Sequence, residues 1–456
     1  PRKGRFFSMN RPAKIIVTVM LLLLSACVSV SRKPDLGKLY GNSLENGEPH
    51  PIIIIPGLMG SSLNAPDGRE VWPGSISDLA FSDYQILTDP DLDLKPRRVI
   101  DGFAGVDFYG ALVETLEQAA GYHLAVPGQP QSRNDMRRYY LFAYDWRKSN
   151  VLAAGHLHRL IERIRDDFGD PALKVDIIAH SNGGLIARYY LQYGPTDTSV
   201  PDWQPEPWQE GPGHVRRLAM LGTPNLGSVI SVLRLYEGYK MGLRTIPIQV
   251  MTQFATPYET MPIPRSRMII DANGTPQDID LYALQSWQGN QWSVFSPMFR
   301  KQLESELGDP AAAGQRAGAL QRAFAEHLET ARKLQTALSV PLAVTETEIA
   351  LFGGDCHETR NRLLAGRRNG LIELHGDESG LAEKSPNVDY QHLLYAPGDG
   401  LVTRTSQVAK AQDAYAQQGN ATDLFKAEQT VFLCERHSLL TANPFFQNNL
   451  LYFLLR

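Results

Sequence analysis

The 456-residue sequence has few cysteines and little net charge, and each of these features argues against one class of function. Its three cysteines form no Cys-x-x-Cys pair, and no His-rich spacing accompanies them, so no metal site is indicated. The net charge is only −4, and no Lys/Arg cluster lies along a predicted face. A nucleic-acid partner therefore has little electrostatic support.

The apolar run near the start of the chain is too short to cross a bilayer. It extends from Ile15 to Leu24, whereas a spanning helix needs about 20 residues. Two basic residues, Arg11 and Lys14, precede it, and small residues follow it. This order is typical of a secretory signal, which we expect over residues 1–26, with Met9 as the candidate start of translation. The alternative, a short N-terminal membrane anchor, fits this length poorly.

The end of this signal, Leu24-Ser-Ala-Cys27, resembles the bacterial lipoprotein signal. The resemblance implies that Cys27 becomes a lipid-modified N-terminus, so that acyl chains hold the protein at a membrane surface. Because residue 28 is Val and not Asp, the resemblance to sorting signals further implies the outer membrane of a Gram-negative cell envelope, facing the periplasm or the surface. We expect residues 27–49 to form a tether and residues 50–456 to form the folded domain.

Buried strands alternate with helical patterns along this domain. Ile52–Ile55 is a continuous β-branched run between Pro51 and Pro56, which is typical of a strand buried on both faces. Comparable runs occupy residues 139–144, 175–179, 215–221, 349–352 and 430–433. Helical patterns occupy residues 108–120, 156–168 and 184–193. The alternation predicts a mainly parallel sheet that is covered by helices on both faces.

Two stretches interrupt this alternation. Residues 195–214 contain several prolines and two tryptophans, and we expect a long surface loop there. Residues 227–343 contain no clear sheet strand, although Arg316–Ala337 is helical in pattern. An insertion of this size is more often functional than a linker. We therefore expect a cap or lid over about residues 227–343.

Val175–Gly184 has the pattern of a nucleophile elbow. A strand is followed by Ala179, then Ser181, then Gly183 and a helix. An elbow holds its serine in a strained conformation, so the residues two before and two after it must be small, and the hydroxyl projects from the carboxyl edge of the sheet. We predict Ser181 as a catalytic nucleophile, the alternative being an ordinary turn with a serine N-cap. His180 is expected to be structural and to face away from the nucleophile.

Two backbone N–H groups are expected to form an oxyanion hole beside this serine. One belongs to Asn182, the residue after the nucleophile, where the N-terminus of a helix favours negative charge. The other is expected just after the first buried strand, in Pro56-Gly-Leu-Met-Gly60, with Leu58 as the candidate donor. The alternative for this segment is a simple glycine turn.

The base and acid of such a site follow the nucleophile in the order Ser, Asp or Glu, His. His437 is the last histidine and follows the last predicted strand, so we predict it as the base. Three earlier histidines are expected to be solvated or structural: His357, His375 and His392. Two acids remain open at this point. Asp355 follows the strand at residues 349–352, and Asp399 lies in a glycine-flanked turn.

Six segments together resemble the lecithin:cholesterol acyltransferase family, which includes the lysosomal-type phospholipases. In family order they are Pro56-Gly-Leu-Met-Gly-Ser-Ser-Leu63, Tyr144-Asp-Trp-Arg147, Ala179-His-Ser-Asn-Gly-Gly184, Gly222-Thr-Pro-Asn-Leu-Gly227, Gly398-Asp-Gly-Leu-Val402 and Arg436-His-Ser438. The resemblance implies an α/β-hydrolase fold, lipid ester substrates and Asp399 as the triad acid. Parts of two of these segments, Asp145-Trp-Arg147 and Gly222-Thr-Pro224, are expected to be structural.

The expected reaction is acyl transfer through an acyl-enzyme, without a metal or organic cofactor. Ser181, deprotonated by His437, attacks an ester carbonyl, and Asp399 orients the imidazole. Water or a lipid alcohol then accepts the acyl group. The family resemblance and the predicted lipid anchor favour a phospholipase or lipid acyltransferase. The alternatives are an esterase for small soluble esters and a catalytically inactive, lipid-binding envelope lipoprotein, although an intact triad argues against the latter.

Cys356 and Cys434 are expected to form a disulfide. In this fold the strands that end near them are parallel neighbours, about 4.8 Å apart, which lies within the roughly 4.4–6.8 Å that a disulfide spans between Cα atoms. Export would supply the oxidising compartment. The alternative is a pair of buried free thiols.

Overall fold

The computed structural model describes residues 34–41, 48–82, 84–89, 92–198, 203–241, 244–342, 346–410 and 423–456. The predicted signal and the predicted lipid attachment at Cys27 lie outside these ranges. The folded unit extends from Leu36 to Arg456. Within the described ranges, no helix combines the length and the apolar composition that a membrane span requires.

Seven strands form the central sheet, and every neighbouring pair described in it is parallel. Across the sheet the order is β19 (Gln429–Leu433), β14 (Glu348–Gly354), β10 (Val215–Leu221), β9 (Val175–His180), β1 (Ile52–Ile55), β8 (Arg138–Leu141) and β7 (His123–Leu124). Six of these strands correspond to the predicted runs. The edge strand β7 is only two exposed residues long and has no apolar run that could have predicted it.

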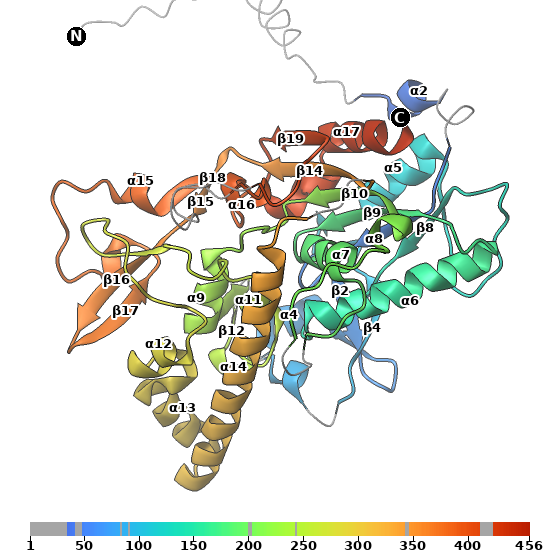
Figure 1. Cartoon of the computed structure of the whole chain (residues 1–456). Helices are drawn as coiled ribbons and strands as arrows, with labels where there is room; N and C mark the ends of the chain where they lie inside the picture. The colour runs from blue at the N-terminus through green and yellow to red at the C-terminus, as the bar shows by residue number, and fades with distance from the viewer. Residues whose placement is uncertain are drawn as a thin grey trace, which may run out of the picture. The chain divides into compact units, whose positions relative to one another are not determined.

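Helices cover both faces of this sheet (Figure 1). Alternate residues of β1 point to opposite sides, as the two-residue period of a strand requires. Ile52 and Ile54 pack with α5 (Gly110–Ala120) and α17 (Pro444–Leu455). The other two isoleucines of β1 face α6 and α7, which span Asn150–Phe168 and Asn182–Tyr193. The predicted α/β-hydrolase fold, with a parallel sheet between two helical layers, is therefore confirmed.

Part of the predicted tether is folded. Residues Leu36–Tyr40 form the short helix α2. The Tyr40 hydroxyl lies 2.7 Å from the backbone carbonyl and 3.0 Å from the side-chain oxygen of Asn448, in α17. A free linker over residues 27–49 is thus wrong for Leu36–Tyr40, which packs against the domain because its aromatic ring and hydroxyl find partners there.

The insertion between β10 and β14 is largely helical. Its elements are α9 (Val229–Glu237), β11 (Tyr239–Met241), β12 (Arg244–Ile246), α10 (Ile248–Met251), α11 (Thr256–Glu259), β13 (Ile269–Ile270), α12 (Leu284–Gly289), α13 (Pro297–Leu307) and α14 (Pro310–Leu338). Its described strands do not join the central sheet. The helix α14 contains the whole of the predicted Arg316–Ala337 pattern.

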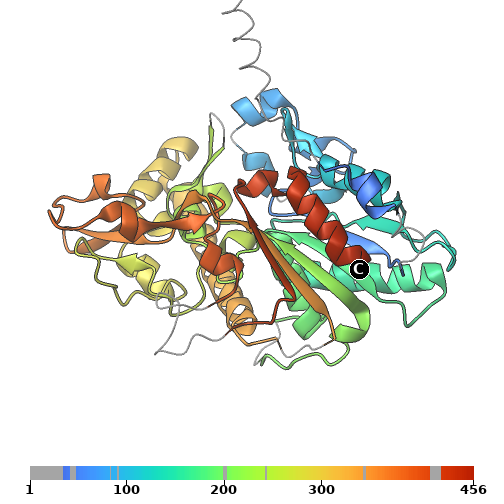
Figure 2. The same cartoon turned by 90° about the horizontal axis from the view of Figure 1, so that it is seen from above.

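A second excursion, between β14 and β19, joins this insertion. It contains β15 (His357–Arg360), β16 (Leu363–Arg368), β17 (Leu371–His375), α15 (Tyr390–Leu394), β18 (Tyr395–Gly398) and α16 (Arg404–Gln407). The strand β16 pairs with β13 of the first insertion. In Figures 1 and 2 the orange hairpin β16–β17 lies beside the yellow segments. The cap is therefore not confined to residues 227–343, because this pairing joins segments far apart in sequence.

The remaining elements lie around the sheet. They are β2 (Ser61–Asn64), β3 (Glu70–Trp72), α4 (Ile76–Phe81), β4 (Lys95–Val99), β5 (Gly102–Phe103), β6 (Val106–Asp107) and α8 (Gly211–His214). Helix α8 occupies the end of the segment expected to be a loop at residues 195–214, and β2, β3 and β4 form a small antiparallel sheet.

Candidate active site

Ser181 stands at the junction of β9 and α7 with a strained backbone. Its φ is 54° and its ψ is −123°, a combination that costs a non-glycine residue about 1–3 kcal/mol. The Ser181 N–H donates to the Leu221 carbonyl at 2.7 Å. A Cβ at Gly183 would lie 2.7 Å from the Ile55 oxygen, so only glycine fits two residues after the serine. The turn therefore has the stereochemistry of a nucleophile elbow.

Three side chains from distant parts of the chain meet at this turn. His437 Nε2 lies 2.9 Å from Ser181 Oγ, and His437 Nδ1 lies 2.7 Å from Asp399 Oδ2. The His437 backbone N–H also donates to the Asp399 carbonyl at 2.9 Å. His437 begins the 3-10 helix His437–Ala442 after β19, and Asp399 follows β18. The structure thus brings together all three residues of the predicted triad.

The contacts of Asp399 determine the tautomer of His437. Oδ1 of Asp399 accepts hydrogen bonds from the Leu401 and Val402 N–H groups, at 3.0 and 2.8 Å. An ionised carboxylate only accepts hydrogen bonds, so Oδ2 accepts the proton that His437 carries on Nδ1. Nε2 is then left without a hydrogen and faces the Ser181 hydroxyl, ready to accept its proton.

The competing acid, Asp355, lies at the end of β14 and has a different partner. Its carboxylate is half-buried and lies 3.8 Å from an Nη1 of Arg404. Asp399, not Asp355, is the acid in contact with His437. Both acids fit the expected order along the sequence. Only Asp399 reaches His437, because β18, which pairs with β15, ends directly before it.

Gly222, in the predicted Gly222-Thr-Pro224 turn, makes room for the acid and the base. Its φ is 55°, and a Cβ there would lie 3.0 Å from both Asp399 Oδ2 and His437 Nδ1. Any side chain would therefore crowd the hydrogen bond between them. Pro224 lines the cavity beside Ser181. The turn shapes the pocket wall, in agreement with the structural role expected from the sequence.

His180 is buried and tied to the base. Burial lowers the pKa of His180 to about 3, so it is neutral. Tyr109 accepts the Gly57 N–H at 2.8 Å and lies 2.9 Å from His180 Nδ1. Because the other ring nitrogen, Nε2, lies 3.1 Å from the His437 carbonyl, it must be the protonated one. His180 therefore links the turn after β1 to the backbone of His437. It is structural as expected, yet it contacts the site and lines the cavity. Tyr109 has no sequence motif that could have predicted this contact.

The two candidate oxyanion donors lie beside Ser181, because Leu58 and Asn182 both line the same cavity. Leu58 belongs to a turn that is closed by the Gly60 N–H and the Gly57 carbonyl at 3.0 Å. Met59 in this turn has a φ of 65°, a strained value of the kind that clusters at functional sites.

The side chain of Asn182 is held within the core. Its Nδ2 donates to the Tyr144 hydroxyl at 3.0 Å and to Asn150 Oδ1 at 2.7 Å. Asn150 Nδ2 donates back to Asn182 Oδ1 at 2.9 Å. These bonds anchor the first turn of α7, whose positive dipole end favours an anion near Ser181.

A cavity of about 420 Å³ opens onto Ser181. Much of its wall is apolar and includes Leu58, Met59, Trp72, Ile100, Phe103 and Phe108. The cap contributes residues of α9 and β11, and the acid turn contributes Leu401 and Val402. An apolar cavity of this size beside a nucleophile suits a hydrocarbon chain.

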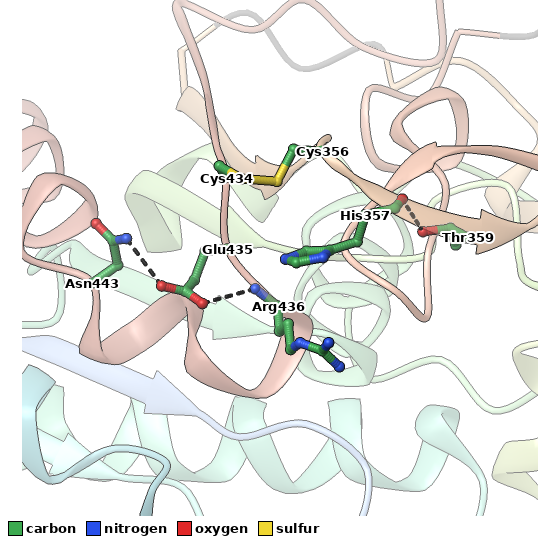
Figure 3. Close-up of a disulfide and its surroundings, with 7 residues drawn as sticks. All are labelled: Cys356, His357, Thr359, Cys434, Glu435, Arg436 and Asn443. Atoms are coloured by element: carbon green, nitrogen blue, oxygen red, sulfur yellow. Dashed lines mark hydrogen bonds between the residues drawn. A yellow bond between two sulfur atoms is a disulfide. The ribbon is translucent and has the colours of Figure 1, made fainter. Parts of the chain in front are cut away.

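The predicted disulfide between Cys356 and Cys434 is present, with the Cα atoms 5.0 Å apart (Figure 3). It joins the segments that follow β14 and β19. Cys434 lies three residues before His437. Both cysteines are solvent-exposed, unlike the buried thiols of the alternative. Figure 3 also shows the Glu435 carboxylate accepting hydrogen bonds from the Arg436 N–H at 2.9 Å and from Asn443 Nδ2 at 3.2 Å. Covalent and polar contacts together hold the segment that leads to His437.

The segment Asp145-Trp146-Arg147 braces the fold away from the nucleophile. Arg147 makes two hydrogen bonds to the Asp145 carboxylate, at 2.9 and 2.8 Å. Trp146 is fully buried and donates its indole N–H to the Ser61 carbonyl at 3.0 Å. These contacts support the structural role expected from the sequence.

Two groups of potential metal ligands occur in the described part of the chain, and neither suits a cation. In the first, Cys356 and Cys434 are disulfide-bonded, which leaves only His357 as a donor. The second combines His158, Glu162 and His214. In it, Arg165 Nη1 lies 3.2 Å from Nε2 of His214. The Arg165 charge and the use of this nitrogen as an acceptor both oppose a bound metal ion.

Comparisons with known proteins agree with this geometry. Residues 85–280 match the family described as lecithin:cholesterol acyltransferase, which confirms the resemblance predicted from the motifs. No curated protein sequence matches the chain. The crystal structure of the Tle4–Tli4 complex is similar with a TM-score of 0.55 and 16% identity, covering 90% of this chain and 98% of that one. This likeness shows a shared fold.

Weaker structural similarity extends to bacterial lipases. Staphylococcus hyicus lipase gives a TM-score of 0.37 at 12% identity, covering 93% of this chain and 97% of its own. Lipase 1 from Pelosinus fermentans gives a TM-score of 0.35 at 12% identity, covering 89% of this chain and 98% of its own. The family match indicates an enzyme of the acyl-ester hydrolase and acyltransferase type that acts on lipid esters.

Proposed function

We propose that this protein, a lecithin:cholesterol acyltransferase relative with an α/β-hydrolase fold, is a serine phospholipase or lipid acyltransferase. The observation that carries the proposal is the hydrogen-bonded series from Ser181 Oγ through His437 to Asp399, at 2.9 and 2.7 Å. The apolar cavity beside Ser181 supports a substrate with a hydrocarbon chain rather than a small soluble ester.

In the proposed first step, His437 Nε2 takes the proton of the Ser181 hydroxyl while Oγ attacks the ester carbonyl. The carbonyl oxygen becomes an oxyanion and accepts hydrogen bonds from the Leu58 and Asn182 N–H groups. Asp399 stabilises the imidazolium that forms. When the tetrahedral intermediate collapses, the alcohol leaves with the proton from His437, and the acyl group remains on Ser181.

The second step repeats this chemistry with a new acceptor. Water or a lipid alcohol gives its proton to His437 and attacks the acyl carbonyl, which regenerates the Ser181 hydroxyl. With water the products are a fatty acid and a lysolipid, and with a lipid alcohol the product is a new ester. No step calls for a metal or organic cofactor.

The proposed cellular place of this reaction is the bacterial envelope. The supporting observation is the sequence Leu24-Ser-Ala-Cys27, which resembles a lipoprotein signal and would place acyl chains on Cys27. A lipid anchor would hold the cavity near its substrate, and Val28 supports an outer-membrane location.

The test is Ser181→Ala, with Ser305→Ala as the matched control, because Ser305 is exposed on α13. On the precedent of a complete triad, Ser181→Ala lowers turnover by about a millionfold and abolishes labelling by a fluorophosphonate probe. The control retains both. Wild-type-like turnover in folded Ser181→Ala would refute the assignment. Acyl-chain-length preference against monomeric and emulsified esters then separates a lipid substrate from a small soluble one.

A further inference from the structure

Three residues spaced by three form part of the cavity wall at α9: its N-cap Ser228, and Ser231 and Arg234 within the helix. Residues at this spacing lie on one side of a helix. The two serines have protein partners. Ser228 Oγ donates to the Leu401 carbonyl at 2.9 Å, and Ser231 Oγ lies 2.8 Å from Thr260 Oγ1. Their polar groups are already satisfied, unlike that of Arg234.

Arg234 has a buried, unpaired guanidinium nitrogen. Its Nε is inaccessible to solvent and has no hydrogen-bond partner, and none of the ion pairs found in the described ranges involves it. The guanidinium carbon lies 4.2 Å from the ring centroid of Tyr239, at the start of β11. Stacking on this ring holds the plane of the guanidinium in one orientation without neutralising its charge.

The acid closest to Arg234 along α9 does not neutralise it. Burial raises the pKa of Glu237, and the cation that opposes this shift is Arg360, not Arg234. Among the described residues that line the cavity, Arg234 is also the only Lys, Arg, Asp or Glu. The cavity therefore carries one fixed positive charge in a wall that is otherwise neutral and largely apolar.

An unpaired charge in such a wall is unfavourable until an anion binds to it. Arg stays protonated, and its planar fork matches two oxygens of a phosphate or carboxylate. We infer that Arg234 determines specificity by binding the phosphodiester of a glycerophospholipid while an acyl chain fills the apolar part of the cavity beside Ser181. This inference rests on the proposed function, and it adds the residue that distinguishes phospholipids from neutral glycerides.

The test compares two substrates with the same acyl chains and glycerol, of which only the first carries a phosphocholine head group: dihexanoylphosphatidylcholine and dihexanoylglycerol, both supplied as monomers. Arg234→Gln lowers the ratio of kcat/KM for the first over the second by about 10- to 100-fold, the usual effect of losing charge-assisted hydrogen bonds. The loss is chiefly in KM. Arg234→Lys keeps the charge but loses the fork, so it restores only part of the ratio.

Arg332→Gln is the matched control, because Arg332 is exposed on α14 and paired with Glu329. It keeps the wild-type ratio. An unchanged ratio in Arg234→Gln, or equal losses on both substrates, would overturn the role of Arg234. If the wild-type protein hydrolyses neither ester, the proposed function itself fails, and that result is distinct from loss of selectivity.

Discussion

Replacing Asp399 by Asn tests the catalytic role of the acid, and the structure defines how the new amide must lie. Two backbone N–H groups point at Oδ1, so this position must keep an oxygen. The NH2 group of the introduced amide therefore takes the place of Oδ2 and donates to His437 Nδ1. The imidazole proton is then forced to Nε2, where it faces the Ser181 hydroxyl. In this tautomer His437 is no longer able to accept the serine proton.

The expected loss is about ten-thousandfold in kcat, which corresponds to about 5 kcal/mol of activation free energy. Because Asn has nearly the same shape as Asp, the backbone contacts of the turn persist and the fold is retained. The assay is kcat for a water-soluble p-nitrophenyl ester, together with the rate of fluorophosphonate labelling. Circular dichroism and thermal unfolding establish that the variant is folded.

Asp355→Asn is the matched control. Its carboxylate makes only a long contact of 3.8 Å with Arg404 near the surface, and such pairs contribute about 0–1 kcal/mol to stability. Activity close to that of the wild type is expected. The reasoning would be refuted if Asp399→Asn kept more than about a tenth of wild-type kcat, or if Asp355→Asn lost as much as Asp399→Asn.

Three further predictions concern stability and anchoring. Replacing Cys356 and Cys434 together by Ser, which opens a loop with a sequence separation of 78, lowers the unfolding free energy in denaturant titrations by about 4 kcal/mol; unchanged stability would contradict this. Burial raises the pKa of Glu259 from 4.5 to about 7. Between about pH 4.5 and 7 the folded protein keeps the Glu259 proton while the unfolded chain loses it. The unfolding free energy therefore falls by about 3 kcal/mol as the pH rises through this range. Glu259→Gln should remove this part of the pH dependence, and parallel curves for the two proteins would count against it. Finally, Cys27→Ser should abolish metabolic acyl labelling, and undiminished labelling would mean that the lipoprotein prediction is wrong.

The sequence by itself determined those features whose causes are local. The run Ile52–Ile55 predicted a strand buried on both faces, because a β-branched apolar segment of this length has few other stable placements. Ala179, Ser181 and Gly183 predicted the elbow, because its strained backbone tolerates only small neighbours. The order of strands and helices predicted the parallel sheet. The first two of these signals lie within a few residues of the positions that they specify.

Only the tertiary structure decided what depends on contacts between distant segments. The choice of Asp399 over Asp355 depends on where β18 places its turn relative to His437, and both acids had suitable sequence positions. The cap combines two insertions because β13 pairs with β16, a register that no local pattern reveals. In the sequence, nothing distinguishes Arg234 from the other arginines of helical segments. Its isolation in an apolar wall becomes visible only when the cavity is assembled, because the partners that a charge lacks are defined by the whole fold.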